Sequence, residues 1–198
     1  MQKNLLEYLK SESRKFKDSQ LFDIVLYGSS VKSKEEPRDI DILIVFKEKS
    51  LNERLEIAQS FKQRIKKKIK NPDVKTINLT ELFDSNFSAR QGIFTEGYSL
   101  IDNLPFSLKI GFRGFALFTY SLKNLSHNEK TRFTYSLIGR NDKGMIKKTN
   151  ALHLGKGALI VPIEKSIMFE DFLNQWKVNY KMKYALILEW YQKRKLSI

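Results

Sequence analysis

Two kinds of apolar spacing divide the first hundred residues into helices and strands. Apolar residues three and four apart predict helices over residues 2–17, 52–70 and 80–95. Short apolar or alternating runs predict strands over residues 22–27, 39–46, 74–79 and 97–101. In the run that starts at Asp39, the side chains of Asp39 and Asp41 point one way, and Ile40, Ile42 and Ile44 point the other. This pattern predicts a strand with one apolar face and an acidic beginning.

The rest of the chain alternates strands and helices in a rhythm of its own. Strands are predicted over residues 113–122, 145–153, 157–161 and 178–190. Ser126 and Glu129 form a capping box for a helix that Gly139 ends, and Ser166 caps a second helix. The order strand, helix, strand, strand, helix, strand is that of a ferredoxin-like βαββαβ unit. We therefore expect an α+β protein with two domains, residues 1–101 and 106–198, joined by a linker at residues 102–105.

The charge of the chain adds an expectation about its partners. Thirty-six Lys and Arg against 22 Asp and Glu give 198 residues a formal net charge of +14. Such an excess favours nucleic acid as partner, because neutralising phosphates releases counterions. A lysine-rich surface that serves solubility is the alternative. The sequence has no Cys, no apolar run of membrane-spanning length and no signal-like apolar stretch at its start, so we expect a cytoplasmic protein without a membrane partner.

Polar residues at the ends of the first two predicted strands suggest a chemical site. Asp39 and Asp41 would lie a few ångströms apart on one strand face, where their charges repel and a divalent cation is the natural complement. Oxygen ligands favour Mg²⁺, which binds one or two carboxylates together with substrate phosphates. The turn Gly28-Ser29-Ser30 offers backbone N–H groups and hydroxyls to a triphosphate. Together these residues predict a site of phosphoryl transfer.

The order of these residues resembles a known family. A strand, Gly-Ser, a loop and Asp-hydrophobic-Asp stand here as LYGSSVKSKEEPRDIDILIVF, from Leu26 to Phe46. This is similar to the signature of the DNA polymerase beta-like nucleotidyltransferase superfamily. LTEL (Leu79–Leu82) and TEGYSLI (Thr95–Ile101) resemble later parts of its minimal domain, so the resemblance covers about residues 20–101. It implies a nucleotidyltransferase fold for the first domain.

The resemblance also implies roles for individual residues. They are nucleotide binding for Gly28, Ser29 and Ser30, and catalysis with binding of Mg²⁺, or of Mn²⁺, for Asp39 and Asp41. Active members carry a third carboxylate on the next strand, which serves as base for the attacking hydroxyl or binds the metal. The register that aligns LTEL places Lys75 at that position, and Asp73 lies two residues earlier on the same face. Asp73 is therefore the third catalytic candidate, and Lys75 is a departure from the pattern.

Basic residues elsewhere are candidates for nucleic-acid binding. They come from the predicted helix 52–70 and the segment 139–148, and are Lys66, Lys67, Arg140, Lys143, Lys147 and Lys148. The alternative for both groups is a solvated helix face or an ordinary hairpin. Tyr180, Tyr184 and Trp190 alternate with apolar residues and are typical of a core rather than of base stacking. His127 and His153 have no second ligand at metal spacing.

These expectations combine into one predicted function with two alternatives. The first is Mg²⁺-dependent transfer of NMP from an NTP to a hydroxyl of a nucleic acid, RNA rather than DNA, with release of pyrophosphate. The second is a protein adenylyltransferase, similar to the antitoxins that pair with HEPN toxins. The third is a catalytically weakened protein that binds nucleotide or RNA, which Lys75 favours.

Overall fold

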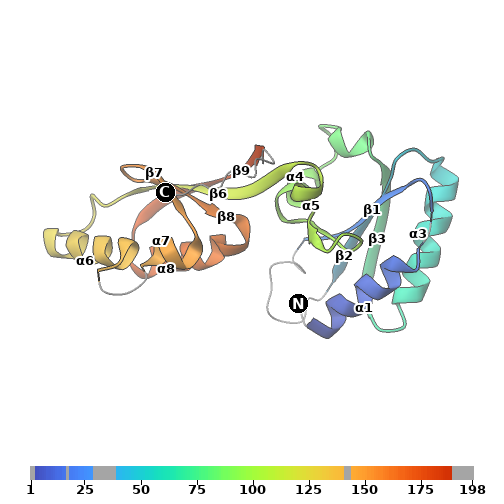
Figure 1. Cartoon of the computed structure of the whole chain (residues 1–198), viewed down its shortest axis with the longest axis horizontal. Helices are drawn as coiled ribbons and strands as arrows, with labels where there is room; N and C mark the ends of the chain where they lie inside the picture. The colour runs from blue at the N-terminus through green and yellow to red at the C-terminus, as the bar shows by residue number, and fades with distance from the viewer. Residues whose placement is uncertain (1–2, 17, 29–38, 141–143, 189–198) are drawn as a thin grey trace, which may run out of the picture. The chain divides into compact units, whose positions relative to one another are not determined.

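The part of the chain up to Gly111 builds a five-stranded sheet with helices on it (Figure 1). The computed structural model describes residues 3–16, 18–28, 39–140 and 144–188, and divides into two compact units, Met1–Gly111 and Phe112–Ile198. In the first unit the strand order is β3-β2-β1-β4-β5. The strands are β1 (Leu21–Tyr27), β2 (Ile40–Phe46), β3 (Pro72–Asn78), β4 (Tyr98–Ser99) and β5 (Leu104–Pro105). β2 and β3 are parallel, and the other neighbours are antiparallel.

Strand β2 is apolar on both of its faces, whereas the sequence pattern predicted one. Ile42 and Ile44 pack in one cluster with Phe61 of α3 (Leu51–Ile65) and Leu9 of α1 (Lys3–Arg14). Leu43 and Val45 point to the opposite face and belong to a second cluster. Side chains two apart on a strand point to the same face, so Asp41 lies on the same face as Leu43 and Val45, at the beginning of β2.

The helical segments of the first unit are shorter than expected. A capping box of Ser50 and Glu53 starts α3, which ends at Ile65 with Lys66 as its C-cap. The expected helix 80–95 is a 3₁₀ turn (Glu81–Phe83) and a separate helix, α4 (Arg90–Glu96). The Asp84 carboxylate accepts a hydrogen bond from the Asn86 amide, a local turn that interrupts the helix. The expected linker 102–105 lies in the first unit, before α5 (Phe106–Lys109).

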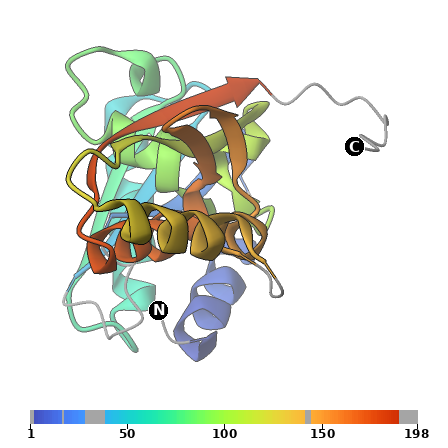
Figure 2. The ribbon, with the colours of Figure 1, turned by 90° about the vertical axis from the view of Figure 1, so that its left-hand side faces the viewer.

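The second unit has the ferredoxin-like order that the sequence predicted. Its four antiparallel strands are arranged β7-β8-β6-β9, with α6, α7 and α8 on one side of the sheet (Figures 1 and 2). The strands are β6 (Phe112–Ser121), β7 (Leu152–Gly155), β8 (Ala158–Pro162) and β9 (Asn179–Leu188). The helices are α6 (His127–Ile138), α7 (Met145–Thr149) and α8 (Ser166–Gln175), with a 3₁₀ turn at Ile163–Lys165.

Three details of the second unit correct or support the sequence analysis. The expected strand 145–153 begins as helix α7, because Met145 and Ile146 pack into the core and Asn150 ends the helix in a left-handed conformation (φ 54°). Ser166 is the first residue of α8 rather than its cap, and its hydroxyl donates to the Ile163 carbonyl. Tyr180 and Tyr184 pack against the core, as predicted, and Trp190 lies outside the described residues.

Within the described ranges, no helix is long and apolar enough to cross a membrane.

Candidate active site

Three aspartates meet where β2 and β3 begin. Asp41 on β2 is paired with Asp73 on β3 in the parallel register, and Asp39 precedes β2 by one residue. Burial raises the pKa of the Asp41 carboxyl, and the nearby carboxylates of Asp73 and Asp39 raise it further, against the opposing effect of Lys75. The residues that raise this pKa are themselves acidic, so the three carboxylates form one electrostatic group.

Lys75 is the ion-pair partner of Asp73 in this arrangement. In the parallel register Lys75 is paired with Leu43, two residues further along the strands than the Asp41–Asp73 pair. Its Nζ is 3.2 Å from Oδ2 of Asp73. The hydrogen bond with Asp73 raises the pKa of the Lys75 ammonium, so Lys75 keeps its charge beside the carboxylates. The residue next to Asp41 on β3 is therefore an acid and not the lysine.

Gly28 approaches the Asp41 side chain from the end of β1. Tyr27 is paired with Asp41 in the antiparallel register, and Gly28 follows with a φ of 76°. A Cβ atom at position 28 would overlap Oδ2 of Asp41 and lie 3.3 Å from its Cγ. Glycine is thus required both by the backbone conformation and by the room that the carboxylate needs. Ser29 and Ser30, the other nucleotide-binding candidates, lie outside the described residues.

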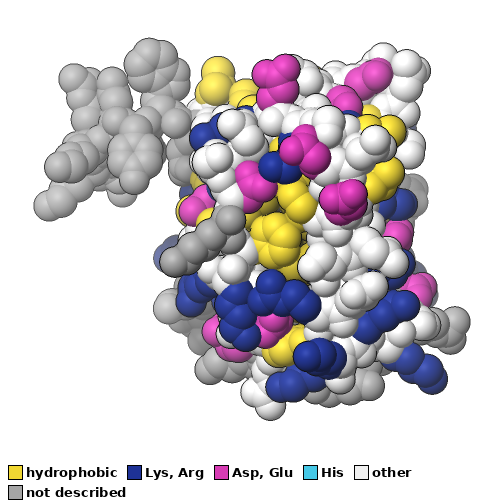
Figure 3. All heavy atoms as spheres, turned by 90° about the vertical axis from the view of Figure 1, so that its right-hand side faces the viewer, with side chains coloured by type: hydrophobic (Ala, Val, Ile, Leu, Met, Phe, Trp, Pro, Cys, Tyr) yellow, Lys and Arg dark blue, Asp and Glu magenta, His cyan; other side chains and the backbone are white. Residues whose placement is uncertain are grey.

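A hollow of about 430 Å³ adjoins the carboxylates. Its lining residues are Asp39, Asp41, Asp73, Asn71, Pro72, Lys62, Lys66 and Lys70. Figure 3 views the first unit from the side of α3, where Lys and Arg side chains gather beside Asp and Glu side chains. The hollow can therefore receive a ligand that carries negative charge and shares a cation with the carboxylates.

The donor set fits a hard divalent cation that also binds substrate. The described part of the chain contains no group of three or more His, Cys, Asp or Glu placed to hold a metal ion by themselves. Mg²⁺ does not need such a cage, because it is commonly bound by one or two carboxylates plus substrate phosphates. Asp39 and Asp41, at the start of β2 and with the pKa of Asp41 raised partly by its acidic neighbours, are oxygen donors of the type that such a cation takes.

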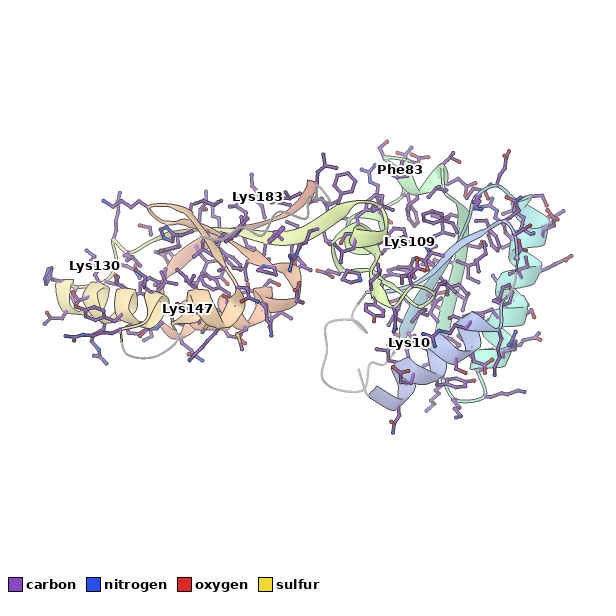
Figure 4. The ribbon with its side chains drawn as sticks, in the orientation of Figure 1. Lys10, Phe83, Lys109, Lys130, Lys147 and Lys183 are labelled. Carbon is purple, nitrogen blue, oxygen red and sulfur yellow. The ribbon has the colours of Figure 1, made fainter. Side chains whose placement is uncertain are left out.

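The predicted nucleic-acid ligands are divided between the two units. Lys66 lines the hollow beside the aspartates, whereas Lys67, next in the chain, does not. Lys147 and Lys148 are exposed at the end of α7. Lys147 lies on the side of the sheet that carries the helices (Figure 4). Arg140 lies 5.0 Å from the centre of the Tyr135 ring. Lys143 falls outside the described residues.

The hollow also contains two lysines that belong to the lysine-rich face of the predicted helix 52–70 but were not among the individual candidates. Lys62 and Lys70 line the hollow together with Lys66. The spacing of four residues was a signal in the sequence, since such residues share one side of a helix, although α3 itself ends at Ile65 and Lys70 lies beyond it. His127 and His153 are exposed in the second unit, and His153 lines a separate hollow of about 660 Å³ with Lys130 and Lys156.

Comparison with known proteins bears on the first unit. Residues 8–102 match the family model described as polymerase beta, nucleotidyltransferase. No curated protein matches the chain at a significant level. A chain in the solved complex of the tri-AMPylated Shewanella oneidensis HEPN toxin with MNT antitoxin is 24% identical, with a TM-score of 0.34; the match covers 50% of this chain and 71% of that one. A chain in a mutant of the toxin–antitoxin MntA-HpeT is 20% identical over 50% of this chain and 73% of that one, with a TM-score of 0.33.

Proposed function

We propose, on the premise that residues 8–102 match the polymerase beta nucleotidyltransferase family model, that the chain transfers a nucleoside monophosphate from an NTP to an acceptor hydroxyl. The observation that carries the proposal is the pairing of Asp41 with Asp73, beside Asp39 and next to the turn at Gly28. In this proposal Asp73, on the neighbouring strand, is the third carboxylate beside the Asp39–Asp41 motif.

The proposed reaction is a single displacement at phosphorus. The acceptor oxygen attacks the α-phosphorus of the NTP and forms a new P–O bond. The bond from the α-phosphorus to the oxygen that bridges to the β-phosphate breaks, and pyrophosphate leaves with that bond's electron pair. Asp73 accepts the proton of the attacking hydroxyl and then releases it to water.

The other side chains position the reacting groups. Asp39 and Asp41 would hold Mg²⁺, which when bound neutralises phosphate charge and aligns the reacting oxygens. Lys75 fixes the Asp73 carboxylate through their ion pair. Gly28 leaves room for the Asp41 carboxylate, and the turn that follows it, with Ser29 and Ser30, would bind the nucleotide phosphates.

The acceptor that we propose is a nucleic acid, RNA rather than DNA. The net charge of +14 supports a polyanionic acceptor. The second unit supports it as well, since ferredoxin-like sheets serve as RNA-binding modules. We assign residues 106–198, of which Phe112–Ile198 form this unit, to acceptor binding, with Arg140, Lys143, Lys147 and Lys148 as ligands. The experiment must distinguish this acceptor from two alternatives. One is a protein acceptor, and the other is binding of nucleotide and RNA without turnover.

The test is an incubation of the full chain with each labelled NTP, Mg²⁺ and either total RNA or total protein. Label in RNA, lost in the variant that combines Asp39→Asn and Asp41→Asn, supports the proposal. Label in protein supports an adenylyltransferase-type activity instead. Absence of transfer from any NTP to either acceptor, with salt-sensitive RNA binding retained, would contradict the enzymatic reading and favour the binding protein.

A further inference from the structure

Three lysines form a row on one wall of the hollow that contains the carboxylates. Lys62 is in the last turn of α3, Lys66 is its C-cap, and Lys70 follows before β3. Lys62 and Lys66 are four residues apart, which on a helix corresponds to a rise of about 6 Å, and Lys70 comes four residues after the C-cap. All three line the hollow together with Asp39, Asp41 and Asp73. We call Lys62, Lys66 and Lys70 the lysine row.

The ammonium groups of the lysine row are available to a ligand. None of the three lysines has an ion pair or a side-chain hydrogen bond with another residue in the part of the chain that the structure describes. The three aspartates of the hollow are equally unpaired with the row, although both sets line the same space. Asp73 pairs with Lys75 instead. The lysines and the aspartates share the hollow without contacting each other. This leaves room for an anionic ligand whose negative groups bind the lysine row and which shares a metal ion with the aspartates.

The position of the row separates it from the nucleotide phosphates. Gly28 follows β1, which flanks β2 on one side, and Asp73 belongs to β3, which flanks β2 on the other. The lysine row adjoins β3, and Gly28 is not among the residues that line this hollow. In a displacement at phosphorus, the attacking and leaving oxygens are roughly in line on opposite sides of the transferred group. If the triphosphate is bound near Gly28, on the β1 side of the aspartates, the acceptor binds on the β3 side, where the lysine row lies.

We propose that the lysine row binds backbone phosphates of a single-stranded nucleic acid whose terminal hydroxyl is the acceptor. This inference rests on the proposed nucleotidyl transfer and specifies its acceptor site. The row and Asp73 together place a phosphate-bearing strand beside the base that accepts the hydroxyl proton. The lining supports a strand rather than a protein, because it has three cations, three acids and Asn71, with Pro72 as its apolar residue. A protein acceptor would be expected to bury apolar or aromatic anchors.

Adjacent lysines provide a matched pair for the test. Lys66→Gln removes a charge from the row. Lys67→Gln removes the same charge from the next residue, which is exposed and does not line the hollow, and which this proposal leaves out of the phosphate ligands although the sequence pattern included it among the nucleic-acid candidates. Binding of a fluorescent single-stranded oligoribonucleotide to the full chain is measured by anisotropy over a range of salt concentrations, without NTP. Each phosphate contact contributes about 0.7 to the slope of log K against log salt for single strands.

The expected result is specific to the row. Lys66→Gln lowers the magnitude of the slope by about 0.7, the triple change Lys62→Gln, Lys66→Gln and Lys70→Gln lowers it by about 2, and Lys67→Gln leaves it unchanged. Equal slopes for Lys66→Gln and Lys67→Gln, or a wild-type chain that binds no oligonucleotide, would overturn the inference. Lys66, Lys67 and Lys70 are exposed and Lys62 is half-buried, and unchanged urea midpoints verify that these substitutions leave the fold intact.

Transfer assays with the same variants separate this inference from the proposed function. If the slopes change as expected but the wild-type chain transfers no NMP, the proposed reaction fails and the phosphate-binding row stands. If the wild-type chain labels protein and Lys66→Gln labels it equally well, transfer stands and the lysine row is not its acceptor site. If RNA is labelled, the Michaelis constant for RNA should rise in Lys66→Gln and remain at the wild-type value in Lys67→Gln.

Discussion

Gly28→Ala tests the close approach between the turn and the Asp41 carboxylate. The substitution introduces two separate effects: a side chain at a φ of 76°, and a Cβ atom that overlaps Oδ2 of Asp41. Gly111 provides a control for the first effect, since its φ is 84° and a Cβ atom there would meet nothing within 4 Å. Comparison of Gly28→Ala with Gly111→Ala therefore isolates the effect on the carboxylate.

The two variants should be alike in stability and different in activity. Left-handed strain costs roughly 1–2 kcal/mol, and the lost freedom of the unfolded chain returns about 0.4–1, so both variants should lose roughly 1 kcal/mol of unfolding free energy. Asp41 is only partly buried and can rotate away from the new methyl group. Its carboxylate must move by roughly 1 Å, and a displacement of that size costs on the order of 100-fold in rate.

The assays are urea unfolding and single-turnover transfer of labelled NMP. Gly28→Ala should transfer about 100-fold more slowly than Gly111→Ala at saturating Mg²⁺. Equal transfer rates in the two variants would refute the reasoning, because the position of the Asp41 carboxylate would then not matter to the reaction.

Three further predictions concern the third carboxylate and the fold. Asp73→Asn should lower the transfer rate by about 10²–10⁴-fold through loss of the base, measured as the rate against pH, and a rate within tenfold of wild type would exclude Asp73 as base. Lys75→Gln should cost less than Asp73→Asn in the same assay, because Lys75 acts through its ion pair with Asp73. Glu81→Gln should lower the unfolding free energy by about 1–3 kcal/mol at pH 7, because buried Arg54 loses the charged acceptor of two hydrogen bonds. The hydrogen bond from Arg54 lowers the pKa of Glu81 below 4.5, so this difference is present above pH 4.5 and disappears as the pH falls through the folded-state pKa, and urea unfolding at several pH values should show that trend.

The sequence was sufficient for the motif but not for the pairing of strands. The alternation of side chains along a strand places Asp39 and Asp41 on one face, and this does not depend on the rest of the fold. The same period places Asp73 and Lys75 on one face of β3, so the sequence pattern alone does not decide which of them lies beside Asp41. The parallel register, which pairs Asp41 with Asp73 and Leu43 with Lys75, decides it. Register depends on contacts between segments distant in the sequence, and those contacts are not visible in local periodicity.

Short apolar segments account for the main errors in the elements. Residues 145–149 (MIKKT) have too few positions to distinguish a helical repeat from an alternating one. Ile146 and Thr149 could belong to either structure, and packing against the second core made the segment a helix. Longer elements with explicit caps, such as α6 after Ser126, began and ended close to where the sequence predicted. The lysine row illustrates the remaining gap, because spacing indicates a shared face but not what lies opposite to it.

The central claim is that Asp39 and Asp41 support transfer of NMP from an NTP. The most direct measurement is the amount of label that the full chain transfers from each of the four NTPs, with Mg²⁺ and RNA, compared with the double variant Asp39→Asn, Asp41→Asn at matched stability. The account predicts label in RNA for the wild-type chain and a loss of at least 100-fold for the double variant. Equal label from the double variant, or no label from any NTP with the wild-type chain, would contradict it.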